Sequence, residues 1–212
     1  RYYVKRNSSA LIAFSIPSSF SGFNIVSAHT DSPCFKVKWN PEVKAAGFPT
    51  RLNVEAYGGM IMQSWFDRPL SIAGRVFIKR NGKVEEKLVN LGQKFTIVIP
   101  NLAIHQNREA NNGWKISVQK EMLPIFSDGE SSFLDEVASS AECRKEDLLD
   151  YDLFLYNKTA PVFWGAEGEF FSSPKIDDLG CAWTALEALK TSEPKDKIAM
   201  CALFDNEETG SG

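Results

Sequence analysis

The sequence predicts an α/β protein whose chain is interrupted by a β-rich insertion. Residues 198–204 form an apolar run that is too short for a core helix, and two apolar faces are typical of a buried strand in a parallel sheet. Residues 178–190 repeat apolar side chains at helical spacing, with Asp177 at the entrance of the predicted helix. Between about Asn40 and about Asn157 the chain instead consists of short β-like runs separated by Gly, Pro and Asn.

Strands are also predicted ahead of the insertion. Residues 2–4 and 9–16 have the composition of a hairpin that turns at residues 7–8, Asn-Ser. Residues 23–28 form a further short strand that ends at a His-Thr-Asp sequence, residues 29–31. Ligands collect at the carboxyl ends of strands in open α/β sheets, so this sequence is a candidate site.

Within the insertion, three runs have the composition of strands, namely residues 75–79, 94–99 and 115–119. The pair Asn81-Gly82 is a strong hairpin signal because both residues tolerate a positive φ. We therefore expect a hairpin that turns at residues 81–82.

Short helices are predicted near the end of the insertion, and they help to place the limits of the two domains. Residues 132–143 and 146–152 suggest short helices, and α/β character returns from about residue 170. The sequence thus predicts one α/β domain formed by residues 1–40 and 158–212, interrupted by a β-rich domain at residues 41–157.

The composition is ordinary for a globular protein and excludes some function classes. With 43% hydrophobic and 24% charged residues, the 212 residues can bury a sizeable core. The formal net charge of −3 argues against a nucleic-acid partner, which requires a basic face. No stretch approaches the ~20 apolar residues that a membrane span needs. The four cysteines include no Cys-x-x-Cys pair, which favours reduced thiols in a cytoplasmic protein over a zinc ribbon.

Acidic and histidine residues gather at the ends of the predicted elements. Two adjacent acids at a strand end are costly to desolvate unless they bind a cation or take up protons. In this chain three clusters of acidic or histidine residues each terminate an apolar segment. The order of these clusters along the chain points to hydrolytic metal chemistry. The candidate groups are His29 with Asp31, Asp177 with Asp178, His105, and Glu207 with Glu208.

Zinc hydrolysis assigns a different task to each group. His29 is a plausible nitrogen ligand, and Asp31, two residues on, is placed to accept its other N–H and to fix the tautomer. Asp177 is a carboxylate that could bridge two metals. Neighbours on an extended edge point in different directions, so one of Glu207 and Glu208 can bind metal while the other faces water as a base.

Structural alternatives remain open for each cluster taken alone. A His-x-Asp sequence at residues 29–31 is compatible with an ordinary turn. The pair at residues 177–178 could cap a helix, and the pair at residues 207–208 could open one, because acids are favoured in a first turn. His105 could be a core or interface histidine.

The ordered set of motifs resembles the aspartyl aminopeptidase/aminopeptidase I family of dinuclear zinc exopeptidases. The resemblance extends over essentially the whole chain, and the combination of motifs is highly specific. The matching segments are Ala28–Cys34, Gly58-Gly59, Trp65–Leu70, Ala73–Val76, Leu102–Glu109, Lys175–Leu179 and Asn206–Ser211.

The resemblance implies a zinc-exopeptidase-like catalytic domain at residues 1–40 and 158–212, split by a β-rich dimerisation domain. Carried over by position, His29 would bind one zinc, Asp177 would bridge both ions, and Glu208 would bind the second. Glu207 would be the general base, and Asp31 would orient His29. The cofactor is then zinc, two ions per intact subunit, although carboxylate-rich dinuclear sites also accept Mn or Co.

The resemblance also implies partners. Family members remove N-terminal residues, preferentially acidic ones, from peptide substrates. They use a histidine of the dimerisation domain to complete a neighbouring subunit's active site, and His105 falls at that position. They assemble from dimers into dodecamers, so a homo-oligomer is expected.

The chain departs from the family pattern in several ways. Asp178 stands where the family usually has Asn, and Thr209 where Val is common. The family's remaining Asp and His ligands lie beyond residue 212, so we expect the chain to be roughly the first half of such an enzyme and inactive alone. It starts at Arg1 without the family's helical N-terminal portion, so a segment ahead of it, a targeting signal included, stays open.

Two rival functions remain. The chain could be an inactive truncated homologue that acts as an assembly or peptide-binding module. It could instead be a dinuclear aminopeptidase of the glutamyl or deblocking type, which shares the His-x-Asp, Asp and Glu-Glu order. The segments Trp65–Arg68 and Leu102–Glu109 favour the aspartyl type over the latter.

Overall fold

The computed structural model describes residues 1–210 and divides the chain into two compact units. The first unit comprises Arg1–Pro33 and the residues from Pro161 onward, and the second comprises Cys34–Ala160. The predicted α/β class is confirmed, and the predicted insertion, residues 41–157, lies inside the second unit. Ser211 and Gly212, which end the acidic segment singled out above, lie outside the described residues.

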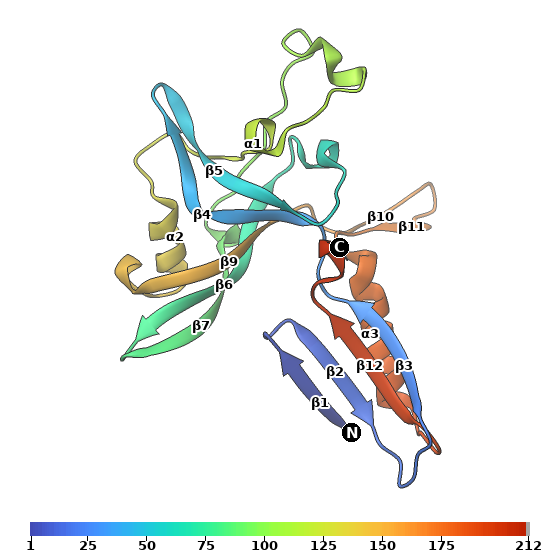
Figure 1. The fold of residues 1–212 in the computed structure, drawn as a ribbon. Helices are drawn as coiled ribbons and strands as arrows, with labels where there is room; N and C mark the ends of the chain where they lie inside the picture. The colour runs from blue at the N-terminus through green and yellow to red at the C-terminus, as the bar shows by residue number, and fades with distance from the viewer. Residues whose placement is uncertain (211–212) are drawn as a thin grey trace. The chain divides into compact units, whose positions relative to one another are not determined.

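A mixed four-stranded sheet, in the order β1-β2-β12-β3, forms the first unit (Figure 1). The expected hairpin is present, because β1 pairs with β2 and the turn residues Asn7 and Ser8 both have positive φ. The expected strand at residues 198–204 is also confirmed, and it pairs parallel with β3 but antiparallel with β2. The strands are β1 Tyr2–Arg6, β2 Ala10–Ser15, β3 Phe23–His29 and β12 Ile198–Phe204.

The helix α3, Ile176–Thr191, packs against β3 and β12 (Figure 1). The buried cluster here consists of three alanines, a cysteine and a leucine, and further leucines, Leu11, Leu186 and Leu189, pack against it. The short helix η5, Glu207–Thr209, follows β12, and a small hairpin precedes α3. The strands of this hairpin, β10 Val162–Trp164 and β11 Phe170–Ser172, had no counterpart among the sequence expectations.

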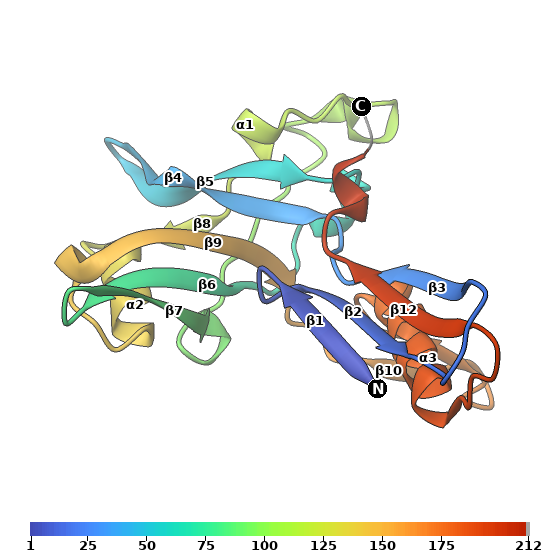
Figure 2. The ribbon, with the colours of Figure 1, turned by 60° about the horizontal axis from the view of Figure 1, so that its bottom comes forward.

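The second unit is built on a six-stranded sheet in the order β7-β6-β9-β4-β5-β8. Figure 2 shows β4, β5, β6 and β9 running side by side. The hairpin predicted at Asn81-Gly82 is confirmed, because β6 pairs with β7 around these two positive-φ residues. The strands are β4 Cys34–Ala45, β5 Phe48–Tyr57, β6 Leu70–Arg80, β7 Lys83–Asn90, β8 Ile125–Ser127 and β9 Leu148–Asn157.

Short helices complete the second unit. The helix predicted at residues 132–143 is confirmed as α2, Phe133–Ser140, and its Phe133 and Val137 are buried in the core of the unit. The other pieces are single turns. They are η1 Met62–Trp65, η2 Leu91–Gln93, η3 Arg108–Asn111, α1 Val118–Glu121 and η4 Lys145–Asp147.

Two expectations in the insertion were wrong and one was imprecise. Residues 146–152 are not helical beyond η4, since burial alternates at Tyr151 and Leu153 as a strand requires. Residues 115–119 form no strand, because the Glu121 carboxylate accepts the Ser117 N–H at 2.7 Å and closes the helical turn α1. Residues 94–99 make only isolated bridges to Phe66, Leu70 and Ile125.

Among residues 1–210, no helix is long and apolar enough to cross a membrane. This agrees with the absence of a long apolar stretch in the sequence.

Candidate metal centre

Two parallel strands bring the candidate residues of the first unit to one edge of its sheet. The register of β3 on β12 pairs His29 with Phe204, so both strands end together. The His-Thr-Asp sequence therefore lies beside the acidic segment that follows β12. This juxtaposition is the one expected where parallel strands share an edge.

Asp31 joins the two strand ends. Its carboxylate accepts the backbone N–H of Glu207 at 3.3 Å and that of Glu208 at 3.1 Å. The helix η5 has no side-chain cap of its own at Asn206, so Asp31 supplies acceptors for its first N–H groups. The Asp31 side chain is 9% exposed. It thus fixes the backbone of both glutamates while leaving their side chains free to bind.

The imidazole of His29 has one nitrogen on Asp31 and the other facing carboxylates. Nδ1 lies 3.1 Å from the Asp31 carbonyl oxygen and 3.3 Å from Oδ1 of the same residue. Both neighbours are acceptors, so Nδ1 carries the proton. Nε2 lies 3.3 Å from Asp177 Oδ1 and 3.9 Å from Glu207 Oε2. The lone pair of Nε2 is therefore directed at carboxylate oxygens, an arrangement that calls for a proton or a cation between them.

A potential ligand set follows from these positions. One ligand atom each from His29, Glu207 and Glu208 lie within 4.8 Å of one another. Asp177 adds a fourth group, because its Oδ1 lies 3.3 Å from His29 Nε2. The Asp177 side chain is 90% exposed. In the part of the chain that the structure describes, no lysine or arginine pairs with Asp177, Glu207 or Glu208. Among the described residues, the negative charge here is thus not compensated by lysine or arginine.

The pKa directions express this crowding. Burial raises the pKa of Glu208, and the neighbouring charge of Glu207 raises it further. Burial by itself would lower the pKa of His29, but the Asp31 carbonyl and the nearby carboxylates outweigh it, and this pKa is raised. The pKa of Asp178 is lowered by hydrogen bonds from the Cys181 thiol and from the His29 N–H. Proton uptake by the site is therefore favoured, as is binding of a metal that replaces the proton.

The donor set fits zinc. An imidazole nitrogen and carboxylate oxygens are ligands that zinc accepts, and the second imidazole nitrogen is already held by an acceptor. The structure thus brings together six of the seven candidate residues, namely His29, Asp31, Asp177, Asp178, Glu207 and Glu208. His105 belongs to the second unit, where it lies in an exposed turn.

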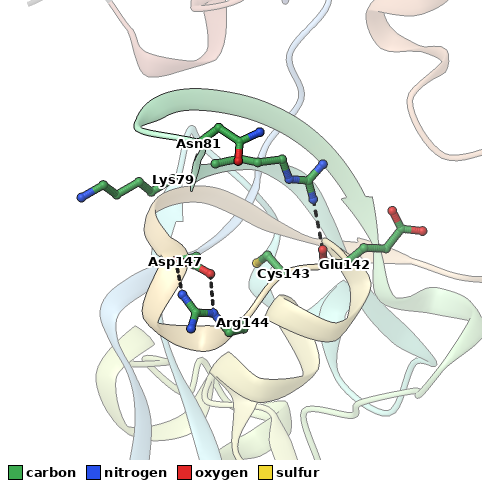
Figure 3. Close-up of a pocket in the computed structure, with 7 residues that line it drawn as sticks. Lys79, Asn81, Glu142, Cys143, Arg144 and Asp147 are labelled. Carbon is green, nitrogen blue, oxygen red and sulfur yellow. Dashed lines mark hydrogen bonds and ion pairs between the residues drawn. The ribbon is translucent and has the colours of Figure 1, made fainter.

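Two features were not anticipated from the sequence. The first is the hydrogen bond from the His29 N–H to Asp178, whose only sequence signal is its position beside Asp177. The second is a cavity of about 550 Å³ in the second unit (Figure 3). Its lining residues are Lys79, Arg80, Asn81, Glu142, Cys143, Arg144 and Asp147.

Most charged groups of this cavity already have partners within the second unit. Arg144 donates two hydrogen bonds to Asp147, at 2.8 and 3.0 Å, and Arg80 donates to the Glu142 carbonyl at 3.1 Å (Figure 3). Burial raises the pKa of the Cys143 thiol, which keeps it protonated and unreactive. Chemistry therefore concentrates in the first unit.

The family follows from comparison with known proteins. The model of the aminopeptidase I zinc metalloprotease (M18) family matches residues 1–212. The chain belongs to this family. The resemblance drawn from the motifs is thereby confirmed.

Relatives and solved structures agree with that assignment. A probable M18 family aminopeptidase 2 of Clostridium acetobutylicum is 43% identical over 222 residues, covering 100% of this chain and 51% of the relative. A protein of the same name from Pseudomonas aeruginosa is 44% identical, with the same coverage. The chain thus spans about half the length of the curated relatives it matches.

Among solved structures, the complex of Ape4 and Nbr1 is similar at a TM-score of 0.85 and 32% identity, over 99% of this chain and 46% of that one. A yeast mApe1 dodecamer is similar at 0.81 and 25% identity, over 99% and 50%. An M18 family aminopeptidase of Thermotoga maritima is similar at 0.79 and 26% identity, over 99% and 49%.

Proposed function

We propose that this protein is a zinc aminopeptidase that removes N-terminal residues, preferentially acidic ones, from peptides. The observation that carries the proposal is the convergence of His29, Glu207 and Glu208 ligand atoms within 4.8 Å, with Asp177 3.3 Å from the free histidine nitrogen. Membership of a zinc metalloprotease family supports the same conclusion.

Three side chains would hold the metal. His29 would hold one zinc through Nε2, Glu208 would hold a second, and the Asp177 carboxylate, 3.3 Å from His29 Nε2, would be shared by both. Bound zinc supplies Lewis acidity that polarises the scissile carbonyl and makes a water molecule acidic enough to give up a proton at neutral pH. Manganese or cobalt suits the same oxygen-rich donors.

Glu207 is the proposed base. Its side chain is 61% exposed and therefore reaches water, while its backbone N–H is fixed by Asp31 at 3.3 Å. A carboxylate oxygen of Glu207 takes a proton from water and returns it to the leaving amine. Asp31 acts indirectly, because its hydrogen bonds orient the His29 ring and anchor both glutamates.

Assembly is the remaining part of the proposal. The second unit would serve as the dimerisation domain, and His105 would complete the site of a neighbouring subunit. A related yeast protein forms a dodecamer, which supports assembly of dimers into the same kind of particle. The cytoplasmic location belongs to this proposal too, since Cys143, Cys181 and Cys201 form no disulfide and reduced thiols are typical of that compartment.

The rival function, an inactive assembly or peptide-binding module, receives less support. Such a module needs no set of converging ligand atoms, yet the strand ends hold one imidazole and several carboxylates together. Losing catalysis would remove the reason to keep uncompensated acids at a sheet edge, because they oppose folding.

The substitution Glu207→Gln in the full-length protein tests the proposal. It should lower kcat by about 10²–10⁴-fold on an acidic N-terminal peptide, since it removes the base while leaving the side-chain shape. Zinc content, measured by atomic absorption, should stay at the wild-type level. The exposed Glu193, on the loop after α3, offers a matched control, and Glu193→Gln should keep full activity. Near-normal turnover in the Glu207 variant would contradict the assignment of the base.

A further inference from the structure

The Asp178 carboxylate lies where helix α3 meets strand β3. Asp177 and Asp178 have non-helical backbone angles, so the regular part of α3 begins after Asp178. The thiol and the backbone N–H of Cys181, three residues on, lie beside the carboxylate and lower its pKa. Asp178 is therefore the N-cap of the regular helix, since an N-cap carboxylate accepts the N–H of the third helical residue.

The same side chain also holds the end of β3. Asp178 Oδ2 accepts the backbone N–H of His29 at 3.0 Å. Among the strands of residues 1–210, β3 lies at the sheet edge and pairs with β12. The next residue, Thr30, donates its N–H to the Phe204 carbonyl on that side. Alternate residues of a strand point their N–H groups to opposite sides. The His29 N–H therefore faces the free edge, where Asp178 supplies its acceptor.

We propose that Asp178 is a positioning residue, a clamp that sets His29 against Asp177 for metal binding. One carboxylate caps the helix that carries Asp177 and fixes the strand end that carries His29. The 3.3 Å separation of His29 Nε2 from Asp177 Oδ1 depends on how these two elements meet. The metal role rests on the proposed function, whereas the clamp itself is a property of the metal-free protein.

The chemistry of a carboxylate suits this double task. An ionised Asp presents acceptors only, on two oxygens, so it can take donors from two elements at once. An amide replaces one of those oxygens with a donor group, which repels the N–H that faced it. A serine caps a helix as well as Asp does, but it offers a single, shorter side-chain oxygen. Asp178→Ser therefore preserves the helix cap and releases His29.

The closing experiment compares Asp178→Ser with Asp196→Ser in the full-length protein. Asp196 is an exposed residue of the same unit, on the loop before β12, and serves as the control. In chelator-treated protein, hydrogen-exchange mass spectrometry should show the His29 amide exchanging on the order of tenfold faster in Asp178→Ser alone. Amides within α3 should keep their protection. Zinc affinity, measured by competition with a chromophoric chelator, should fall about 10–100-fold in Asp178→Ser and stay unchanged in the control.

Each result decides one part of the inference. Unchanged exchange of the His29 amide in Asp178→Ser overturns the clamp. Faster exchange with an unaltered zinc affinity overturns the positioning role. A wild-type protein that binds no zinc, while Asp178→Ser still exchanges faster, refutes the proposed function and supports the clamp. If α3 loses protection in the serine variant, Asp178→Asn provides the same readouts with the side-chain shape retained, and a weakened His29 hydrogen bond is again expected.

Discussion

The two units of the chain differ in what they bury. The second unit has a continuous core whose aromatic and aliphatic side chains are fully buried, among them Phe35, Leu52, Ile72, Phe133 and Leu153. The buried cluster of the first unit contains only Ala28, Ala182, Ala185, Cys201 and Leu203. Its large apolar side chains are instead exposed in the described residues, for example Tyr2, Phe23, Phe163 and Trp183.

The two units also differ in how their carboxylates are neutralised. In the second unit, Asp152 is neutralised by Lys36 at 2.7 Å and by Arg75 at 3.0 Å. In the first unit, Asp177 and Glu207 converge on one histidine nitrogen. The Asp152 carboxylate of the second unit is therefore compensated within the unit, whereas the first unit holds carboxylates that a ligand must satisfy.

The largest expected effect tests the core of the second unit. Phe35→Ala should lower the free energy of unfolding by about 3–5 kcal/mol, because it empties a fully buried site where the ring packs edge-on against Trp65. Phe163→Ala in the first unit removes the same ring from a position that is 73% exposed and should cost about 1 kcal/mol or less, through its contact with Phe171. Urea denaturation measures both. Equal losses would show that the two units do not differ as described.

Zinc should stabilise the first unit. At a free zinc concentration 100 times the Kd, the free energy of unfolding should rise by about 2.7 kcal/mol, because only the folded protein holds the ligands together. The substitution His29→Ala removes the imidazole that the described residues contribute to the ligand set and should abolish the gain. Thermal unfolding with zinc and with a chelator measures the difference. A gain that persists in the His29 variant would place the zinc elsewhere.

Much of the site could be predicted because its residues follow short, clear elements. The apolar runs before His29 and before Glu207 are strands in the structure, and their parallel pairing explains why polar residues distant in sequence meet. The hydrogen bonds that Asp31 receives from both glutamate N–H groups could not be predicted, since the geometry of η5 decides them. The acceptor role of Asp178 depends likewise on where α3 begins.

The fold was harder to predict in the insertion. Residues 148–157 include good helix formers, but their partners β6 and β4 select a strand and bury alternate residues. Residues 115–119 have strand-like composition, yet a local capping interaction wins over it. In the first case strand pairing with distant segments outweighs helix propensity, and in the second a local hydrogen bond outweighs strand propensity.

A close backbone approach in the second unit gives the next prediction. Gly74 lies on β6 against β9, where a Cβ atom would clash with the carbonyl oxygen of Asp152. Gly74→Ala should therefore destabilise the protein by about 1–3 kcal/mol, because a backbone atom cannot move aside cheaply. A Cβ atom at Gly59 would meet no heavy atom within 4 Å. Gly59→Ala should therefore leave the free energy of unfolding unchanged within about 0.5 kcal/mol. Equal stabilities of the two variants in urea would contradict the tight pairing of β6 with β9.

The smallest effect concerns the neutralised carboxylate. Burial alone would raise the pKa of Asp152, but hydrogen bonds from Lys36 and Arg75 outweigh it, and this pKa is lowered. A lowered folded-state pKa adds stability that is fully present above the unfolded value of about 3.9 and is lost as the pH falls through the folded value. Asp152→Asn should therefore cost about 1 kcal/mol at pH 6 and progressively less below about pH 3.9.

Urea unfolding of wild type and variant across this pH range measures that change. Glu142 provides the comparison, because its pairing with Lys87 is open to water and Glu142→Gln should give a weaker pH dependence. A cost for Asp152→Asn that stays constant down to pH 2 would mean that its charge is irrelevant and that only its hydrogen bonds matter. The second unit would then lose its role as the region where charges are compensated, and the contrast with the metal centre would rest on the apolar cores alone.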